Sequence, residues 1–316
     1  MMYLEHFGLA QAPFKITPHT EFFFSGANRG ATLDALIYAI RAGDGLVKVT
    51  GEVGAGKTML CRVLIEKLPA DVETIYLAIP SLTRDEILQA IAADLKLRTK
   101  TLNTAGVLER IQERLIKLHG QGRQVVVLID EAHAMPLETL EELRLLSNLE
   151  TNRDKLLQIV LFGQPELDQH LAKPHMRQVK ERITHSFFLR PMPKKDIGDY
   201  LNFRLRAAGY HGPDIFTERC VAMITSVSAG LTRRVNILAD KTLLAAYADG
   251  TYTVEPRHVT AAIEDSDFSR PRWWSPALAW AFGGGVVATA LAVLIWAITP
   301  ISDPVPRADT AAQASR

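Results

Sequence analysis

The sequence predicts an α/β fold, in which a parallel sheet flanked by helices precedes a small all-helical domain and one transmembrane helix. Three observations support this prediction. Short apolar runs alternate with helical patterns from residue 46 to residue 189, as in chains that form parallel sheets. Only helical patterns remain after residue 190. An uncharged run of 22 residues then follows, at 277–298.

The individual elements follow from local patterns. Apolar runs bounded by turn residues predict strands at 46–50, 74–79, 125–129, 156–162 and 185–189. Helical periodicity and start signals predict helices at 57–68, 83–94, 104–120 and 137–149, and then at 194–208, 217–226, 233–248 and 256–265. The predicted domains are therefore a core at 1–190, a helical domain at 191–268, a linker at 269–276, a span at 277–298 and a tail at 299–316.

The composition is that of a folded protein. The 316 residues carry 36 Lys and Arg against 35 Asp and Glu, for a net charge of +1, with 47% hydrophobic residues. These values exclude a disordered tail, a collagenous repeat and a disulfide-rich miniprotein. A dedicated nucleic-acid wrapper needs a basic surface, which the net charge opposes. The two cysteines, Cys61 and Cys220, have no metal-binding spacing, which favours a reducing compartment.

The run at 277–298 is long enough to cross a bilayer as a helix. Trp273, Trp274 and Trp296 lie near its two ends, where aromatic belts lie in membrane proteins. The alternative is a buried core helix, but such helices are usually shorter. No signal-peptide pattern begins the chain, and two arginines come just before the run. We therefore expect a single-pass membrane protein with its larger domain in the cytoplasm.

One octapeptide predicts phosphate binding. Residues 51–58 read Gly-Glu-Val-Gly-Ala-Gly-Lys-Thr and fit the GxxxxGK[ST] pattern between a strand and a helix. Glycines let the backbone N–H groups approach the phosphates, Lys57 reaches the β and γ phosphates, and Thr58 offers a hydroxyl to Mg²⁺. The predicted nucleotide-binding residues are Gly51, Glu52, Val53, Gly54, Ala55, Gly56, Lys57, Thr58 and Met59.

Two carboxylates follow the apolar strand predicted at 125–129. Ligands bind beyond the carboxyl ends of the strands in open α/β sheets, which places Asp130 and Glu131 beside the phosphate loop. We assign Asp130 to Mg²⁺ and Glu131 to the general base that activates water. The alternative is a pair of helix-capping residues. His133 completes the Asp-Glu-Ala-His spelling of one helicase class, but that class needs two such cores, so a packing or solvated histidine is favoured.

Polar residues downstream extend the predicted site. Gln164 follows the strand at 156–162 and is expected to sense the γ-phosphate or orient the water, unless it is only a turn residue before a proline. Arg177 and Arg182 are candidates for an arginine finger that reaches a neighbouring subunit, and a solvated charged face is the alternative. Arg233 begins a helix of the helical domain and is expected to return to the phosphates, with solvated surface again as the alternative.

The order of these motifs resembles that of the AAA+ ATPases. Their amino-acid sequences resemble those of the general secretion pathway protein A (ExeA-type) family and its pilus-biogenesis relative MshM. The matching segments lie at 3–9, 13–14, 17–18, 51–58, 128–132, 163–167, 182–184 and 230–236. The resemblance implies a P-loop AAA+ core with a helical lid, ATP with Mg²⁺ as ligands, and a ring or dimer of subunits. It also implies that Gln164 is the first sensor, Arg182 the finger and Arg233 the second sensor, and that the segment around Tyr3–Phe14 packs near the adenine.

Departures from the family pattern limit the inference. Longer relatives carry a peptidoglycan-binding domain beyond the span, and the 18 residues after it cannot hold one, so direct peptidoglycan binding is in doubt. Thr232 and Glu181 replace the usual proline and glutamine. We expect an ATPase that drives or regulates assembly of a secretion, type IV pilus or exopolysaccharide export apparatus, through partners of that apparatus. The rivals are a DNA-acting ATPase, which the span and the charge oppose, and a nucleotide-gated scaffold with little turnover.

Overall fold

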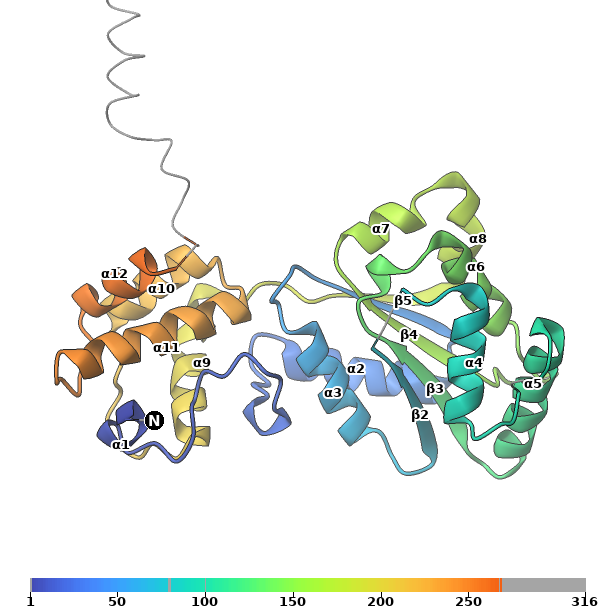
Figure 1. Cartoon of the computed structure of the whole chain (residues 1–316), viewed down its shortest axis with the longest axis horizontal. Helices are drawn as coiled ribbons and strands as arrows, with labels where there is room; N and C mark the ends of the chain where they lie inside the picture. The colour runs from blue at the N-terminus through green and yellow to red at the C-terminus, as the bar shows by residue number, and fades with distance from the viewer. Residues whose placement is uncertain (1, 79–80, 100, 267, 269–316) are drawn as a thin grey trace, which may run out of the picture. The chain divides into compact units, whose positions relative to one another are not determined.

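A five-stranded parallel sheet determines where the site lies. The computed structural model describes residues 2–78, 81–99, 101–266 and 268. Its strands are β1 (Leu46–Thr50), β2 (Val72–Leu77), β3 (Gln124–Ile129), β4 (Gln158–Gly163) and β5 (Ile183–Phe188), in the spatial order β2-β3-β4-β1-β5 (Figure 1). Every neighbouring pair is parallel, with Thr50 opposite Gly163 and Ile129 opposite Leu161. The predicted parallel α/β fold is confirmed.

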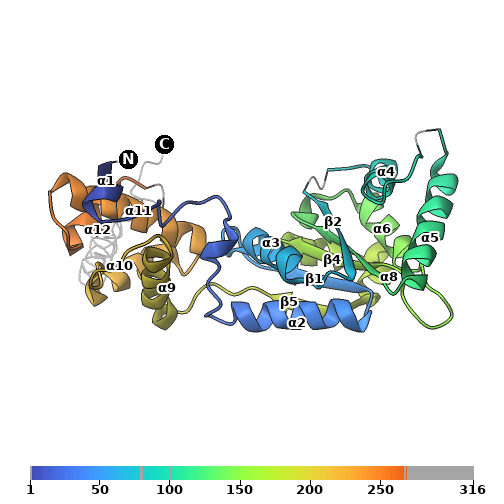
Figure 2. The ribbon, with the colours of Figure 1, turned by 90° about the horizontal axis from the view of Figure 1, so that it is seen from below.

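Both faces of the sheet are covered by helices, as the continuous apolar strands predict. Val125, Val127 and Ile129 of β3 are buried on one face, against α4 (Arg84–Asp94), α5 (Thr104–Gly120), α6 (Leu137–Leu146), α7 (Glu166–Leu171) and α8 (Arg177–Glu181). Val126 and Leu128 are buried on the other face, against α2 (Arg29–Ala42) and α3 (Lys57–Lys67). Figure 2 shows α2 and α4 on opposite sides of the strands.

The helical part contains α9 (Lys194–Ala207), α10 (Glu218–Ser228), α11 (Thr232–Ala248) and α12 (Pro256–Glu264). The start of the chain, including α1 (Met2–His6), packs with these helices and not with the sheet: Tyr3, Phe7 and Phe14 are buried in the same apolar cluster. The Tyr3 hydroxyl donates to Asp240 of α11 at 2.8 Å. The predicted core at 1–190 therefore begins with a segment that packs on the helical part.

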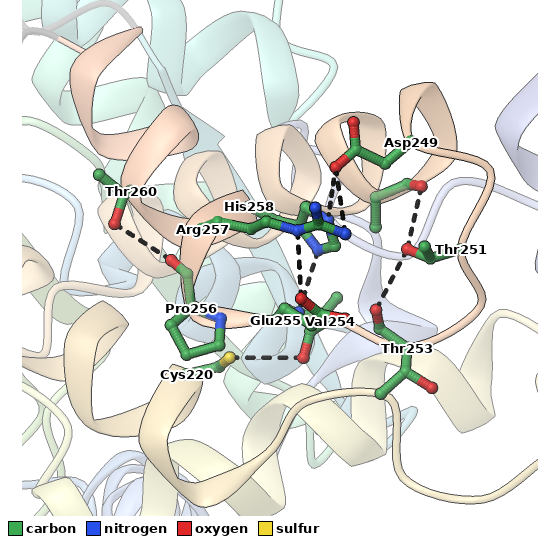
Figure 3. A network of polar contacts seen from close by, with 11 residues as sticks. Cys220, Asp249, Thr251, Thr253, Val254, Glu255, Pro256, Arg257, His258 and Thr260 are labelled. Carbon is green, nitrogen blue, oxygen red and sulfur yellow. Dashed lines mark hydrogen bonds and ion pairs between the residues drawn. The ribbon is translucent and has the colours of Figure 1, made fainter.

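The last described helix begins with a proline, as its sequence predicts. Pro256 occupies the first turn of α12, and the preceding residue caps the helix because Glu255 and His258 bond each other's backbone N–H groups. His258 is buried and lies 3.1 Å from Asp249, which also contacts Arg257 (Figure 3). This polar network ties the loop before α12 to the end of α11.

Some predicted boundaries differ from the structure. The strand predicted at 74–79 runs from Val72 to Leu77, because Val72 already bonds the carbonyl of Pro69 and pairs with Gln124. The helices α1, α2, α7 and α8 were not predicted. Three of them are too short for helical periodicity to register. The fourth, α2, follows Asn28, whose φ is +63° and whose side chain makes no capping bond.

The membrane prediction falls outside the described part of the chain. Among the described residues, no helix combines the length and the apolar character needed to cross a bilayer. The predicted linker, span and tail, at 269–276, 277–298 and 299–316, lie outside the described residues.

Candidate nucleotide site

The loop between β1 and α3 has the backbone of a phosphate cradle. Gly54 and Gly56 have φ angles of +79° and +103°, which residues with a Cβ rarely adopt. A Cβ on Gly51 would lie 2.8 Å from the carbonyl oxygen of Leu189. Helix α3 begins at Lys57 with no side-chain cap, so its first N–H groups remain for an anion. The loop predicted at 51–58 therefore has the required shape.

Lys57 is held inside this loop. Its ammonium group donates to the carbonyl oxygens of Gly51 at 2.8 Å and of Glu52 at 3.1 Å, and only 5% of the residue is exposed. Burial lowers the pKa of Lys57, and the carboxylates of Glu131 and Asp130 oppose that change. An anionic phosphate in the loop would stabilise the charged ammonium in the same way.

The two predicted carboxylates follow β3, and they have different surroundings. Asp130 is buried, and one carboxylate oxygen accepts from the backbone N–H of Glu131 at 2.9 Å. The other oxygen lies 3.5 Å from the Tyr76 hydroxyl, and burial together with the charge of Asp130 raises the pKa of Tyr76 to about 12. Glu131 is 44% exposed and has a φ of +53°, a conformation that costs energy in any residue except glycine.

The geometry brings Gln164 and His133 to Glu131. The side-chain amide of Gln164 donates to the Glu131 carboxylate at 3.4 Å, and the Gln164 backbone N–H donates to Nδ1 of His133 at 3.4 Å. Nδ1 also lies 3.5 Å from the same carboxylate. One nitrogen cannot accept from Gln164 and donate to Glu131 at once, so these two contacts are alternatives set by the histidine tautomer.

His133 is therefore more than the packing or solvated residue favoured by the sequence. It is 17% exposed and lies in contact with two of the predicted site residues. The Asp-Glu-Ala-His spelling was the available signal, but it pointed to a different protein class. Only the parallel pairing of β3 with β4 shows that His133 and Gln164 lie side by side.

The first turn of α11 contacts the phosphate loop. The backbone N–H of Arg233 donates to the carbonyl oxygen of Gly54 at 3.0 Å, and a Cβ on Gly54 would lie 2.7 Å from the Cβ of Arg233. Thr232 donates to the carbonyl oxygen of Ala55 at 3.4 Å. Arg29 of α2, which the sequence analysis did not single out, also reaches this carbonyl, at 3.2 Å.

A cavity of about 360 Å³ joins these parts, within the size range of small-molecule sites. Its lining includes Lys57, Thr58, Met59, Glu131, Gln164, Arg233 and Arg29. It also includes Lys15, Ile16, Pro18 and Phe22 to Phe24. In the segment expected near the adenine, Tyr3, Phe7 and Phe14 are buried in the helical cluster and do not line this cavity.

The two candidate finger arginines lie away from the cavity of their own chain. Arg177 is exposed and pairs with Glu181 at 2.8 Å. Arg182 is exposed at the end of α8, directly before β5, and has no ion pair within the described residues. Both positions leave the prediction of a finger that acts on another subunit untested.

The residues present fit a magnesium nucleotide. The hydroxyl of Thr58 and the carboxylate of Asp130 are the oxygen donors that Mg²⁺ prefers, and phosphate oxygens and water normally supply its remaining ligands. Lys57, the open first turn of α3 and the glycine-rich loop supply the donors for the phosphates.

Sequence comparison places the chain among known proteins. Residues 40–171 match the family described as AAA domain. General secretion pathway protein A of Aeromonas hydrophila is 38% identical over 288 residues, which cover 90% of this chain and 52% of that protein. This chain therefore spans about half the length of that relative.

Solved structures show the same fold. The CDC6P protein of Pyrobaculum aerophilum matches with a TM-score of 0.63 at 17% identity, over 82% of this chain and 72% of that chain. The ORC2 protein of Aeropyrum pernix, in ADPNP-ADP complexes, matches with a TM-score of 0.62 at 15% identity, over 83% and 72%. The RuvB branch migration motor of Thermotoga maritima matches with a TM-score of 0.52 at 15% identity, over 80% of this chain and 73% of that chain. At these identities the likeness shows the fold alone.

Proposed function

Because the chain belongs with general secretion pathway protein A among the AAA ATPases, we propose that it binds ATP with Mg²⁺ and hydrolyses it between the phosphate loop and α11. One observation carries this proposal. The ends of β1, β3 and β4 bring Lys57, Glu131 and Gln164 to the same cavity, although they come from three separate parts of the chain.

The proposed roles follow from the contacts. Lys57 turns from the loop carbonyls to the phosphates. Thr58 and Asp130 would hold Mg²⁺, which would supply positive charge to neutralise the phosphate oxygens. Glu131 takes a proton from water while the water oxygen bonds to the γ-phosphorus and ADP leaves with the electron pair of the broken P–O bond. Gln164 is within reach of the Glu131 carboxylate and orients that water.

Arg233 lines the cavity and supplies a further positive charge from the helical part. Arg182 lies on the surface and would complete the site of a second subunit. We therefore propose that turnover requires assembly of at least two chains, because a cationic finger lowers the barrier only where the transition state develops negative charge.

The proposed cellular role is based on the similarity to general secretion pathway protein A of Aeromonas hydrophila. Its printed name assigns it to the general secretion pathway, and this chain matches about half of it. We propose that this ATPase serves assembly of a secretion or surface apparatus, of the pilus or exopolysaccharide type, from the inner membrane. The span at 277–298 would hold it there, with residues 2–268 in the cytoplasm, where ATP is available.

Two substitutions in the full chain test the enzymatic proposal. Lys57→Ala removes the phosphate-binding ammonium and should abolish tight binding of a fluorescent ATP analogue. Glu131→Gln removes the base and should bind ATP but release no phosphate. Lys67→Ala, an exposed lysine at the end of the same helix, is the control and should match the unmodified protein in both assays. Normal hydrolysis by Glu131→Gln would refute the assignment of the base.

The secretion role has a separate test. Expression of Glu131→Gln beside the native protein should trap mixed assemblies in the ATP-bound state and reduce secretion or surface assembly in the native cell. Glu138→Gln, which changes an exposed glutamate in the first turn of α6, should leave both unchanged. Unaltered secreted and surface proteins with an inactive ATPase would contradict the proposed role and leave the ATPase assignment standing.

A further inference from the structure

Arg29 is a buried cation that joins three parts of the molecule. It is the first residue of α2 and is 5% exposed. One terminal nitrogen of its guanidinium, Nη2, donates to the carbonyl oxygen of Ala55 at 3.2 Å and to the hydroxyl oxygen of Thr232 at 3.1 Å. A single side chain therefore links α2, the phosphate loop and the first turn of α11, although Thr232 lies 203 positions further along the chain.

The other terminal nitrogen of Arg29 has no hydrogen-bond partner among the described residues. Nη1 is buried and forms no hydrogen bond within the described part of the chain. Burial lowers the pKa of Arg29, whereas Tyr200 and Asp196 act to raise it. Arginine stays protonated in proteins, so this nitrogen is a buried charged donor. Such donors are costly without an acceptor, and Arg29 lines the cavity that holds Lys57 and Thr58.

The contacts around Arg29 connect α11 to the carbonyl groups of the phosphate loop. Thr232 accepts from Arg29 and donates to the carbonyl oxygen of Ala55 at 3.4 Å. The next residue, Arg233, donates its backbone N–H to the carbonyl oxygen of Gly54 at 3.0 Å. The loop carbonyls thus bond α11, while the loop N–H groups are those that bind phosphates.

We infer that Arg29 is a positioning residue that couples bound nucleotide to α11. Nη1 donates to an oxygen of the nucleotide, and the same guanidinium, through Nη2, holds Thr232 and the first turn of α11 on the phosphate loop. This inference rests on the proposed nucleotide binding. It adds a cation to the site beside Lys57 and Arg233, and it makes Thr232 the contact by which α11 responds to the nucleotide.

The test compares variants of the full chain by fluorescent ADP binding and by hydrogen–deuterium exchange in the segment that contains Gly230 to Arg234. Arg29→Met keeps the length of the apolar stem but removes the donors, and should weaken binding about tenfold. Bound ADP should slow exchange of this segment in the unmodified protein. It should not do so in Arg29→Met, because the link to Thr232 is gone. A merely structural arginine would not change this nucleotide-dependent protection.

Thr232 provides a pair of variants that does not depend on replacing a buried charge. Thr232→Val removes the hydroxyl but keeps the branched shape, and should weaken ADP binding severalfold and lose the protection. Thr232→Ser restores the hydroxyl and should rescue both. The matched control is Thr242→Val in the same helix, where, among the described residues, the lost hydroxyl bonds only the carbonyl oxygen of Leu238. This control should bind ADP like the unmodified protein.

The outcomes separate the two proposals. In a double-mutant cycle, Arg29→Met and Thr232→Val should weaken binding together by less than the product of their separate effects, because both break one link. Unmodified protein that fails to bind ADP would overturn the proposed function, and this inference with it. Binding within twofold of the unmodified protein for both single variants, or full additivity in the cycle, would overturn the coupling by Arg29 and leave the proposed function intact. If Arg29→Met fails to fold, the valine and serine variants of Thr232 decide alone.

Discussion

Replacing Gly54 by alanine should separate the contact with α11 from the rest of the site. Its φ of +79° costs an alanine about 1–2 kcal/mol. The new Cβ would also lie 2.7 Å from the Cβ of Arg233, so α11 must move away and the bond from the Arg233 N–H to the loop is lost. That bond contributes about 1 kcal/mol, and the displacement adds to the loss. The backbone strain is present with and without nucleotide, so only the lost contact weakens binding, by about 1–2 kcal/mol or about 5- to 30-fold.

Gly250 supplies the matched control for this experiment. Its φ is +67°, and no atom lies within 4 Å of the position of an added Cβ. Gly250→Ala should therefore lower the free energy of unfolding by about 1–2 kcal/mol through its backbone alone. Fluorescent-nucleotide titration and urea denaturation of both variants, in the same detergent, measure the two effects. Equal dissociation constants for Gly54→Ala and Gly250→Ala would show that the contact between α11 and the loop does not support binding.

Other substitutions test the remaining parts of the site. His133→Ala should lower the rate of phosphate release about tenfold or more with little change in ATP affinity, because it removes a contact to Glu131 and not to the phosphates; an affinity loss of the same size would contradict this. Mixing Lys57→Ala with Arg182→Ala should restore part of the ATPase activity, since each chain lacks a different half of a shared site, and activity independent of protein concentration would argue against it. A reporter active only in the periplasm should be active after Arg316 and inactive after Phe268, and the reverse result would refute the predicted orientation.

Local sequence patterns predicted the parts of this fold that depend on residues close together in the sequence. The apolar run at 125–129 predicts a strand buried on both faces, and its residues alternate between the two apolar clusters. The octapeptide at 51–58 could be recognised from sequence because two of its positions, Gly54 and Gly56, have positive φ angles that favour glycine. Asp130 and Glu131 follow from the rule that ligands bind at the carboxyl ends of parallel strands.

Residues that act only through distant partners were not predictable in this way. Arg29 belongs to no motif, and its importance depends on Thr232 returning to it from another part of the chain. His133 and Gln164 meet because β3 and β4 are neighbours, which the sequence order does not state. The resemblance predicts that Tyr3–Phe14 packs near the adenine. The structure shows Tyr3, Phe7 and Phe14 buried among the helices that follow the sheet, a contact that no local pattern indicates.

The packing of the first residues against the last helices has a consequence for synthesis. The contact between Tyr3 and Asp240 joins positions 237 residues apart, which a ribosome translates in roughly 10–50 s. During that interval the sheet can form, but Phe7 and Phe14 lack part of the helical cluster that buries them until α11 is made. We therefore expect their apolar side chains to be more exposed in the nascent chain than in the finished protein. A tag fused at the start, or a truncated first segment, should impair the stability of the helical part more than that of the sheet.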